Sequence, residues 1–293
     1  RTGDPGESQL VTSGDGDPIV IWVEGTTSEF IETPVPYDFQ TSGEIFARQY
    51  GGQDLGWWGL QPGGGDTIPI GTGSQISAES GKQGQIVVTW VNGTGADSEI
   101  YGRMWDGSDW VELVGSATGG GISDDGVPNE RPDVEISDTG EIFVSYTALH
   151  PQSDQQEIVV KSLSVDFGGQ PATGPIQEVD LVWTELVNED VGLFGENITS
   201  GITNDLANSF GAAISLDLEN NPVVVWTHER ASGQMEIYLK RWVGDSWEEL
   251  GLESASDFND DGLSGVSRDA AMSIQPDIHV TEGGEFVVSW VSW

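Results

Sequence analysis

A fifteen-residue pattern occurs five times in this chain without gaps, and each copy ends in an aromatic residue. Each copy reads as a short strand, a turn usually marked by Gly, and a second strand that is apolar throughout. A hairpin repeated in this way limits the chain to architectures in which each unit packs on its neighbours. The copies are SQLVTSGDGDPIVIW (8–22), ISAESGKQGQIVVTW (76–90), PDVEISDTGEIFVSY (132–146), AAISLDLENNPVVVW (212–226) and PDIHVTEGGEFVVSW (276–290).

A third strand follows each of the first four copies. It reads EIFARQY (44–50), EIYGRMW (99–105), EIVVKSL (157–163) and EIYLKRW (236–242). A fourth strand is expected around Trp57 or Trp58, Trp110, Trp183 and Trp247, across a short turn typical of a hairpin.

These four strands per unit, with no helical periodicity, predict an all-β fold: a β-propeller of repeated four-stranded antiparallel blades, with four full units and part of a fifth. The units are expected at approximately 8–70, 74–125, 130–200, 210–262 and 274–293, within one repeat domain spanning 1–293. Because the fifth unit stops after its second strand, we expect the chain to be a segment of a longer repeat protein.

Two Trp-rich segments carry a family resemblance. WDGSDWVELVG (105–115) and WVGDSWEELG (242–251), each with its preceding E-I-Y-x-[RK]-x-W strand, resemble the repeats of bacterial surface β-propellers. More loosely, they are similar to propeller lectins and sialidase-like Asp-box proteins, and SDTG (137–140) is similar to half an Asp box. The resemblance concerns the blade pattern, and no binding residue is taken from it.

The charge of the chain excludes several partners. Its 49 acidic and 10 basic residues give a net charge of −39, which would repel nucleic acid. The same charge requires screening by high salt or by bound divalent ions. The chain has no cysteine, so disulfides and thiolate chemistry are excluded. No apolar run approaches the ~18 residues of a membrane helix, and we expect no membrane insertion.

The recurring Glu and basic residue of the third strand could suggest catalysis. The pairs occur in every complete unit, whereas a catalytic site would occur once, so we interpret them as structural ion pairs within a ladder. They are Glu44 with Arg48, Glu99 with Arg103, Glu157 with Lys161, and Glu236 with Lys240.

Most of the twelve tryptophans occupy repeated positions, which favours blade packing over ligand binding. One member of the Trp57–Trp58 pair does not. We therefore predict a ligand-binding site at Trp58, with Tyr37 and Phe39 from the insertion 26–42, because binding residues favour inserted loops.

No catalytic residue can be assigned from the sequence. Carboxylates are too abundant for a catalytic pair to stand out. The three histidines, His150, His228 and His279, do not indicate a Ser-His-Asp order.

A calcium site is predicted in DFNDDGLSG (257–265). Asp257, Asn259 and Asp261 alternate ahead of a glycine, as the oxygen ligands of an EF-hand loop do. The twelfth position is Arg268, where that loop needs a bidentate Glu, so an ordinary loop capped by its own side chains remains the alternative. A related SDDG occurs at 123–126.

These observations lead to a main reading and two alternatives. We expect a non-enzymatic adhesion or assembly module, extracellular or at the cell surface, stabilised by Ca²⁺ and capable of self-assembly. Its partners would be other protein subunits or surface glycans. The first alternative is a carbohydrate-binding, lectin-like propeller, and the more remote one is a glycoside hydrolase. Sequons at Asn92 and Asn197 permit N-glycosylation.

Overall fold

The computed structural model describes residues 4–31, 38–64, 67–149, 155–165, 181–187, 202–203, 207–230, 232–250, 265–268 and 272–293. This part of the chain contains strands and one short 3₁₀ turn, η1 (Gly95–Asp97). The strands are β1 (Asp4–Thr12), β2 (Pro18–Ile31), β3 (Asp38–Tyr50), β4 (Trp57–Gly59), β5 (Gly71–Ser80), β6 (Ile86–Asn92), β7 (Glu99–Trp105), β8 (Trp110–Val111), β9 (Asn129–Ile136), β10 (Glu141–Leu149), β11 (Gln156–Ser164), β12 (Thr184–Glu185), β13 (Ser209–Leu216), β14 (Pro222–Glu229), β15 (Met235–Val243), β16 (Ser246–Glu249), β17 (Ser273–Val280) and β18 (Phe286–Ser292).

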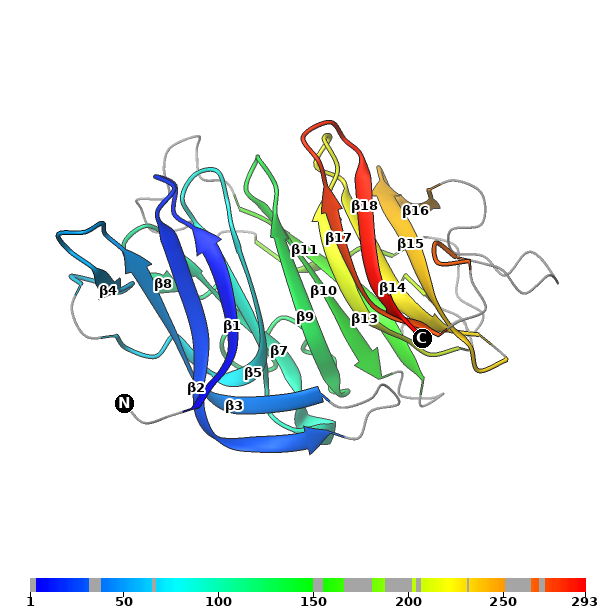
Figure 1. The fold of residues 1–293 in the computed structure, drawn as a ribbon, viewed down its shortest axis with the longest axis horizontal. Helices are drawn as coiled ribbons and strands as arrows, with labels where there is room; N and C mark the ends of the chain where they lie inside the picture. The colour runs from blue at the N-terminus through cyan, green and yellow to red at the C-terminus, as the bar shows by residue number, and fades with distance from the viewer. Residues whose placement is uncertain are drawn as a thin grey trace. The chain divides into compact units, whose positions relative to one another are not determined.

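The strands group in sequence order into blades, as the repeat predicts (Figure 1). We name them blade 1 (β1–β4), blade 2 (β5–β8), blade 3 (β9–β12), blade 4 (β13–β16) and blade 5 (β17–β18). Blades 1 and 2 share one eight-stranded sheet, because the start of β3 also pairs with the start of β5 at Gly43 and Gly73. By contact density the chain divides into two compact units, residues 1–142 with 163–183 and residues 143–162 with 184–293, and each is described by itself.

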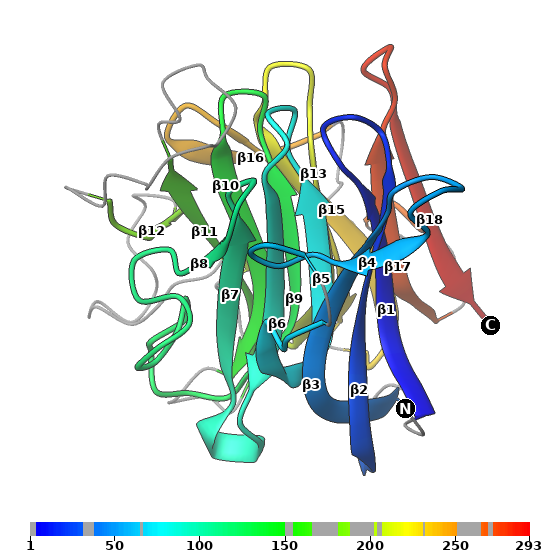
Figure 2. The same cartoon turned by 90° about the vertical axis from the view of Figure 1, so that its left-hand side faces the viewer.

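The pairing within a blade follows the predicted register. In blade 4, Trp226 of the second strand lies opposite Tyr238 of the third, and Trp242 of the third lies opposite Trp247 of the fourth. Figure 2 shows the equivalent antiparallel neighbours β5, β6 and β7 of blade 2 side by side. The second strands of blades 2, 3 and 4 are covered on both faces, and every residue of β6 from Ile86 to Val91 is buried, whereas β18 of blade 5 is largely exposed.

The fourth strand settles which member of the Trp57–Trp58 pair belongs to the repeat. Trp57 lies opposite Tyr50, the last aromatic of the third strand, and their rings are 5.4 Å apart. Trp110 has the same relation to Trp105 in blade 2, at 5.7 Å. Trp57 is therefore the repeated tryptophan, and Trp58 is the additional one.

A hydrogen bond between consecutive blades recurs at the fourth strand. The indole nitrogen of a Trp donates to the carbonyl oxygen of the Leu that follows the fourth strand of the preceding blade. The pairs are Trp110 Nε1 to Leu60 O (2.8 Å), Trp183 Nε1 to Leu113 O (3.1 Å) and Trp247 Nε1 to Leu186 O (2.7 Å). This contact explains why a W-x-x-L spacing repeats, since buried indole N–H groups need an acceptor.

The start of the third strand is held by the connection that leads to the next blade. In each case a hydroxyl accepts a hydrogen bond from the N–H of the strand's first Ile, and the neighbouring apolar residue donates its own N–H to the carbonyl of that Ile. The hydroxyl pairs are Ile100 N to Ser123 Oγ (2.9 Å), Ile158 N to Thr203 Oγ1 (3.1 Å) and Ile237 N to Ser267 Oγ (3.1 Å). The sequence analysis did not identify this repeated G-[IV]-[ST] signal at 121–123, 201–203 and 265–267.

Candidate functional site

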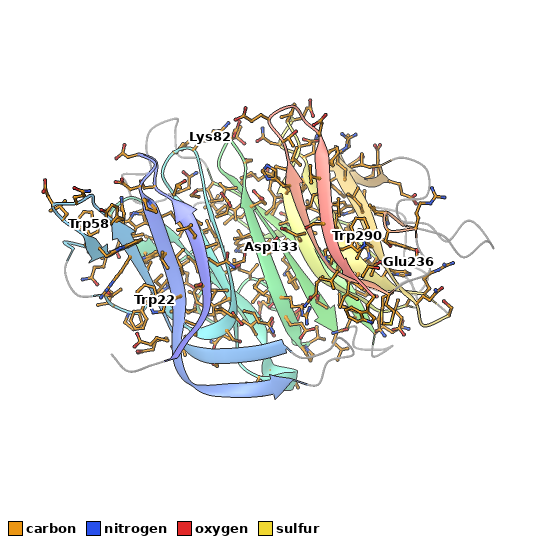
Figure 3. The ribbon with its side chains drawn as sticks, in the orientation of Figure 1. Trp22, Trp58, Lys82, Asp133, Glu236 and Trp290 are labelled. Atoms are coloured by element: carbon orange, nitrogen blue, oxygen red, sulfur yellow. The ribbon has the colours of Figure 1, made fainter. Side chains whose placement is uncertain are left out.

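Three carboxylates lie together on the first strands of blades 2 and 3. Glu79 is on β5, and Asp133 and Glu135 are on β9, on the same side of that strand because they are two residues apart. All three side chains are half-buried, and Asp133 is labelled on its strand in Figure 3. We name these three residues the carboxylate group.

A β-bulge precedes the carboxylate group on β5. The register shifts between Ser74 and Ser77, and Gln75 in the bulge has φ = 51°. Arg131 on β9, in the equivalent position, has φ = 55°, and its backbone N–H donates to the side-chain oxygen of Gln75. Bulges re-aim side chains and bend strands, and here the hydrogen bond from Arg131 to Gln75 in the bulge ties two first strands together just ahead of the acidic side chains.

Hydrogen bonds orient the central carboxylate of the group. Asp133 Oδ1 accepts a hydrogen bond from Ser77 Oγ at 2.7 Å and one from the backbone N–H of Val134 at 3.2 Å. These bonds fix the carboxyl group of Asp133 on β9 and direct it toward β5.

Glu135 is the most perturbed acid of the group. Burial is the largest cause that raises the pKa of Glu135 to about 9, and the negative charges of Glu79 and Asp133 raise it further, against a hydrogen bond from the backbone of Ile136. The pKa of Glu79 is also raised, mainly by burial. At neutral pH, Glu135 therefore carries a proton.

This arrangement can perform acid–base chemistry on a bond that lies between a protonated carboxyl group and a carboxylate. A pair of acids whose environments push their pKa values apart can supply a proton from one and negative charge from the other. Glycosidic bond cleavage uses two carboxyl groups in these roles.

The sequence contains a signal for this group that the sequence analysis missed. At the fourth position of the five aligned fifteen-residue copies stand Val11, Glu79, Glu135, Ser215 and His279. Acids occur there only in two consecutive units, so the group departs from the repeat instead of following it. The same partial occurrence is seen elsewhere in the repeat, for example at the second position with Asp133 and Asp277, so this signal does not by itself single out the group.

Of the three predicted ligand-binding residues, the structure describes Trp58 fully and only the backbone of Phe39. Trp58 lies on β4 with 44% of its side chain exposed, next to the equally exposed Trp57 (49%). Phe39 lies on β3 opposite Phe30, and its side chain is outside the described residues. Tyr37 also lies outside them, so this binding site stays a prediction.

The predicted calcium ligands Asp257, Asn259 and Asp261 lie outside the described residues, and calcium at that loop stays a prediction. Within the described part of the chain, no three His, Cys, Asp or Glu side chains form a group that could hold a metal ion.

The recurring Glu residues of the third strand take several partners. In blade 4, Glu236 is fully buried and Arg230 Nη1 lies 3.1 Å from its Oε1. Lys240 Nζ donates to the carbonyl oxygen of Ile202 at 3.1 Å. In blade 1, Arg48 Nε donates to Thr67 Oγ1 at 3.0 Å. Glu236, Lys240 and Arg48 therefore have structural roles, as expected, but these contacts are made with residues outside the third strand and not with the predicted partners within it.

No protein-family model matches the sequence, and no curated protein matches it. Solved structures do share its fold. An ulvan lyase, described as a new family of polysaccharide lyase, is 12% identical with a TM-score of 0.50, and the match covers 98% of this chain and 66% of the lyase. An endo-arabinase from Bacteroides thetaiotaomicron is 10% identical with a TM-score of 0.46, covering 99% of this chain and 89% of the enzyme. An α-L-arabinofuranosidase from Fusarium graminearum is 12% identical with a TM-score of 0.48, covering 97% and 74%.

These comparisons confirm the predicted fold class: the chain is an all-β, propeller-type protein built of four-stranded antiparallel sheets. They contradict the main functional expectation. The expectation of a non-enzymatic adhesion or assembly module is wrong, because the ulvan lyase, which shares the fold, is an enzyme. The physical reason is that acids are spread over several positions of the repeat, so the sequence does not show which of them lie together in the fold.

No helix in the described part of the chain has the length and apolarity needed to cross a membrane.

Proposed function

We propose that this protein binds a glycan and hydrolyses a glycosidic bond at the carboxylate group. The observation that carries the proposal is Glu135, whose raised pKa keeps it protonated, on the same strand as the hydrogen-bonded Asp133 and beside Glu79 on the neighbouring blade. The shared fold with glycan-active enzymes supports the class of ligand but assigns no residue.

The roles follow from the protonation states. The Glu135 carboxylic acid donates its proton to the glycosidic oxygen as the bond between that oxygen and the anomeric carbon breaks. The Asp133 carboxylate stabilises the positive charge that develops on the sugar. Water adds its hydroxyl group to the anomeric carbon, and its remaining proton returns to the Glu135 carboxylate. Glu79 keeps the proton on Glu135 through its negative charge.

The charge of the chain favours a neutral glycan. A net charge of −39 repels a polyanion over the distance of a Debye length, and the described residues of the carboxylate group add negative charge at the site itself. An uncharged polysaccharide carries no such penalty.

The test is a screen of neutral polysaccharides, with uronic acid polymers as a comparison, for release of reducing ends. Glu135→Gln should lower kcat on any glycan that is cleaved by about 10²–10⁴-fold, the contribution typical of a general acid. The matched control is Glu141→Gln, a half-buried Glu that follows β9 across its turn, which should retain full activity. Equal rates for the Glu135→Gln variant and the unmodified protein would remove the assignment.

Trp58 is a second element of the proposal, as a surface on which a sugar ring stacks. Its exposed indole is not used by the repeat, since Trp57 takes the packing position. Aromatic faces contribute large apolar contact area to binding. Trp58→Ala should raise KM and leave kcat unchanged. Glu135→Gln, by contrast, should act on kcat. An unchanged KM would exclude a role for Trp58 in binding. The proposed setting is extracellular, where polysaccharides are encountered.

A further inference from the structure

The carboxylate of Glu99, at the start of β7, is surrounded by the connection that leads from blade 2 to blade 3. Its Oε2 accepts hydrogen bonds from Ser123 Oγ and, at 3.1 Å, from Asn129 Nδ2. Its Oε1 accepts the backbone N–H of Gly126 at 3.3 Å. The connection includes the SDDG segment (123–126) that the function proposed above does not use.

Three oxygens converge on the side-chain amide of Asn129. Its Nδ2 lies 3.1 Å from Glu99 Oε2, 2.8 Å from Asp125 Oδ1 and 2.7 Å from the carbonyl oxygen of Val127. An amide nitrogen carries two hydrogens and cannot satisfy three acceptors fully. Two of the three acceptors are carboxylates, so negative charge is concentrated at this point.

Asn129 is completely buried, yet its own side-chain oxygen has no hydrogen-bond partner, and neither has the buried Oδ2 of Asp125. Unpartnered buried oxygens are costly, and most such atoms in native proteins have a partner. A turn of the amide about its last bond would place the Asn129 oxygen among the three other oxygens. These four oxygens, two of them from carboxylates, would repel one another unless a cation were bound among them.

The equivalent position in blade 4 shows how the repeat neutralises this Glu. There, Glu236 is paired with Arg230, which stands in the loop between β14 and β15. The corresponding loop of blade 2, residues 93–98, reads GTGADS and holds no basic residue. Among the described salt bridges none reaches Glu99, so the positive charge that blade 4 provides from its own chain is lacking in blade 2.

We propose that Glu99, Asp125, Asn129 and the Val127 carbonyl bind a divalent cation, Ca²⁺, in the connection between blades 2 and 3. The ligands are oxygens only, two of them charged, which matches the preference of calcium for carboxylates, amide oxygens and backbone carbonyls. The site has only two carboxylates, and its other ligands are neutral oxygens. It therefore differs from metal sites that are built from three or more acidic or histidine side chains. The site is independent of the proposed hydrolysis and of the loop at 257–261.

The first test is direct calcium binding to the purified chain by isothermal titration calorimetry in 0.15 M KCl, a salt that screens the general negative charge. Asp125→Asn should either abolish one calcium-binding equivalent or lower its affinity by more than about tenfold. Tenfold is the lower end of the loss seen when a group that only supports a metal ligand is altered. The matched control is Asp124→Asn, the same change at the exposed neighbouring residue, which should bind as the unmodified chain does.

A second variant, Asn129→Asp, tests the ligand role apart from simple folding. Without metal it brings a third carboxylate against Glu99 and Asp125, so thermal unfolding in chelator should occur at a lower temperature. Added Ca²⁺ should restore the lost stability, because a carboxylate is a better calcium ligand than an amide. If Asn129 is only a hydrogen-bond donor, the variant is destabilised equally with and without calcium.

Three results would overturn the proposal. They are the absence of saturable binding, equal binding by the Asp125→Asn and Asp124→Asn variants, and an Asn129→Asp variant that calcium does not rescue. Asp257→Asn distinguishes the two loops: loss of all calcium binding in that variant, with Asp125→Asn unaffected, would place the ion elsewhere.

Discussion

The indole nitrogen of Trp247 donates a hydrogen bond to the carbonyl oxygen of Leu186, a residue 61 positions earlier in the chain, at 2.7 Å. The same relation joins Trp110 to Leu60 and Trp183 to Leu113. Adjacent blades are thus linked by a polar contact as well as by apolar packing, and the tryptophan that recurs in the sequence is both the donor and part of the core.

Trp247→Phe should lower the free energy of unfolding by about 1–3 kcal/mol, since it leaves the buried Leu186 carbonyl without its donor while keeping an aromatic ring. The control is Trp58→Phe, at the exposed tryptophan outside the repeat, for which a change within about 0.5 kcal/mol is expected. Urea unfolding followed by circular dichroism measures both. A loss as large for Trp58→Phe as for Trp247→Phe would contradict the division between packing and exposed tryptophans.

Gly121 and Gly119 provide a matched pair for the connection after blade 2. Both have positive φ, +69° and +59°, so replacement by Ala costs each about 1–2 kcal/mol from the backbone alone. A Cβ on Gly121 would lie 2.3 Å from the carbonyl oxygen of Ile100, whereas one on Gly119 would meet no atom within 4 Å. Gly121→Ala should therefore be clearly less stable than Gly119→Ala in thermal unfolding. Similar melting temperatures would show that the connection can shift.

Arg230→Met should destabilise the protein by about 3–5 kcal/mol, because it leaves the buried carboxylate of Glu236 without its counter-charge. Adding Glu236→Gln to that variant removes the uncompensated charge and should recover a large part of the loss. Chemical unfolding of the two single variants and the double variant gives the coupling. A double variant whose loss equals the sum of the single losses would argue against a direct pair.

The pKa of Glu135 has a consequence for stability. It is about 9 in the folded chain against an ordinary value of 4.5, so the folded state holds a proton that the unfolded state has released between these two values. Unfolding then releases that proton, and stability falls as pH rises from about 4.5 to about 9. Glu135→Gln should reduce this slope without abolishing it, because the pKa of Glu79 is raised as well.

Melting temperatures from pH 5 to pH 9 for the unmodified chain and the Glu135→Gln and Glu141→Gln variants check this. An equally steep fall in all three would mean that Glu135 does not hold its proton. The activity profile provides a second reading, since kcat/KM should decline above about pH 9 as the general acid loses its proton.

The strand pattern and the blade register follow from the sequence alone. Glycine turns, apolar second strands and the E-I-x-x-[RK] third strand are local properties. The hairpin recurs five times and the third strand four times, which strengthens the signal. Pairings such as Trp226 with Tyr238 were therefore predictable. The choice of Trp57 over Trp58 was not, because both fit the spacing until strand pairing places one opposite Tyr50.

The tertiary structure decided what the acids do. In a chain of 49 acidic residues no single carboxylate stands out. Only the packing of β5 against β9 sets Glu79 beside Asp133 and Glu135, and burial there raises the pKa values of Glu79 and Glu135. The convergence of Glu99, Asp125 and Asn129 likewise joins residues from a strand and from the connection after it. Sequence periodicity determines which residues form strands, whereas charge coupling depends on distances between strands, which exist only after folding.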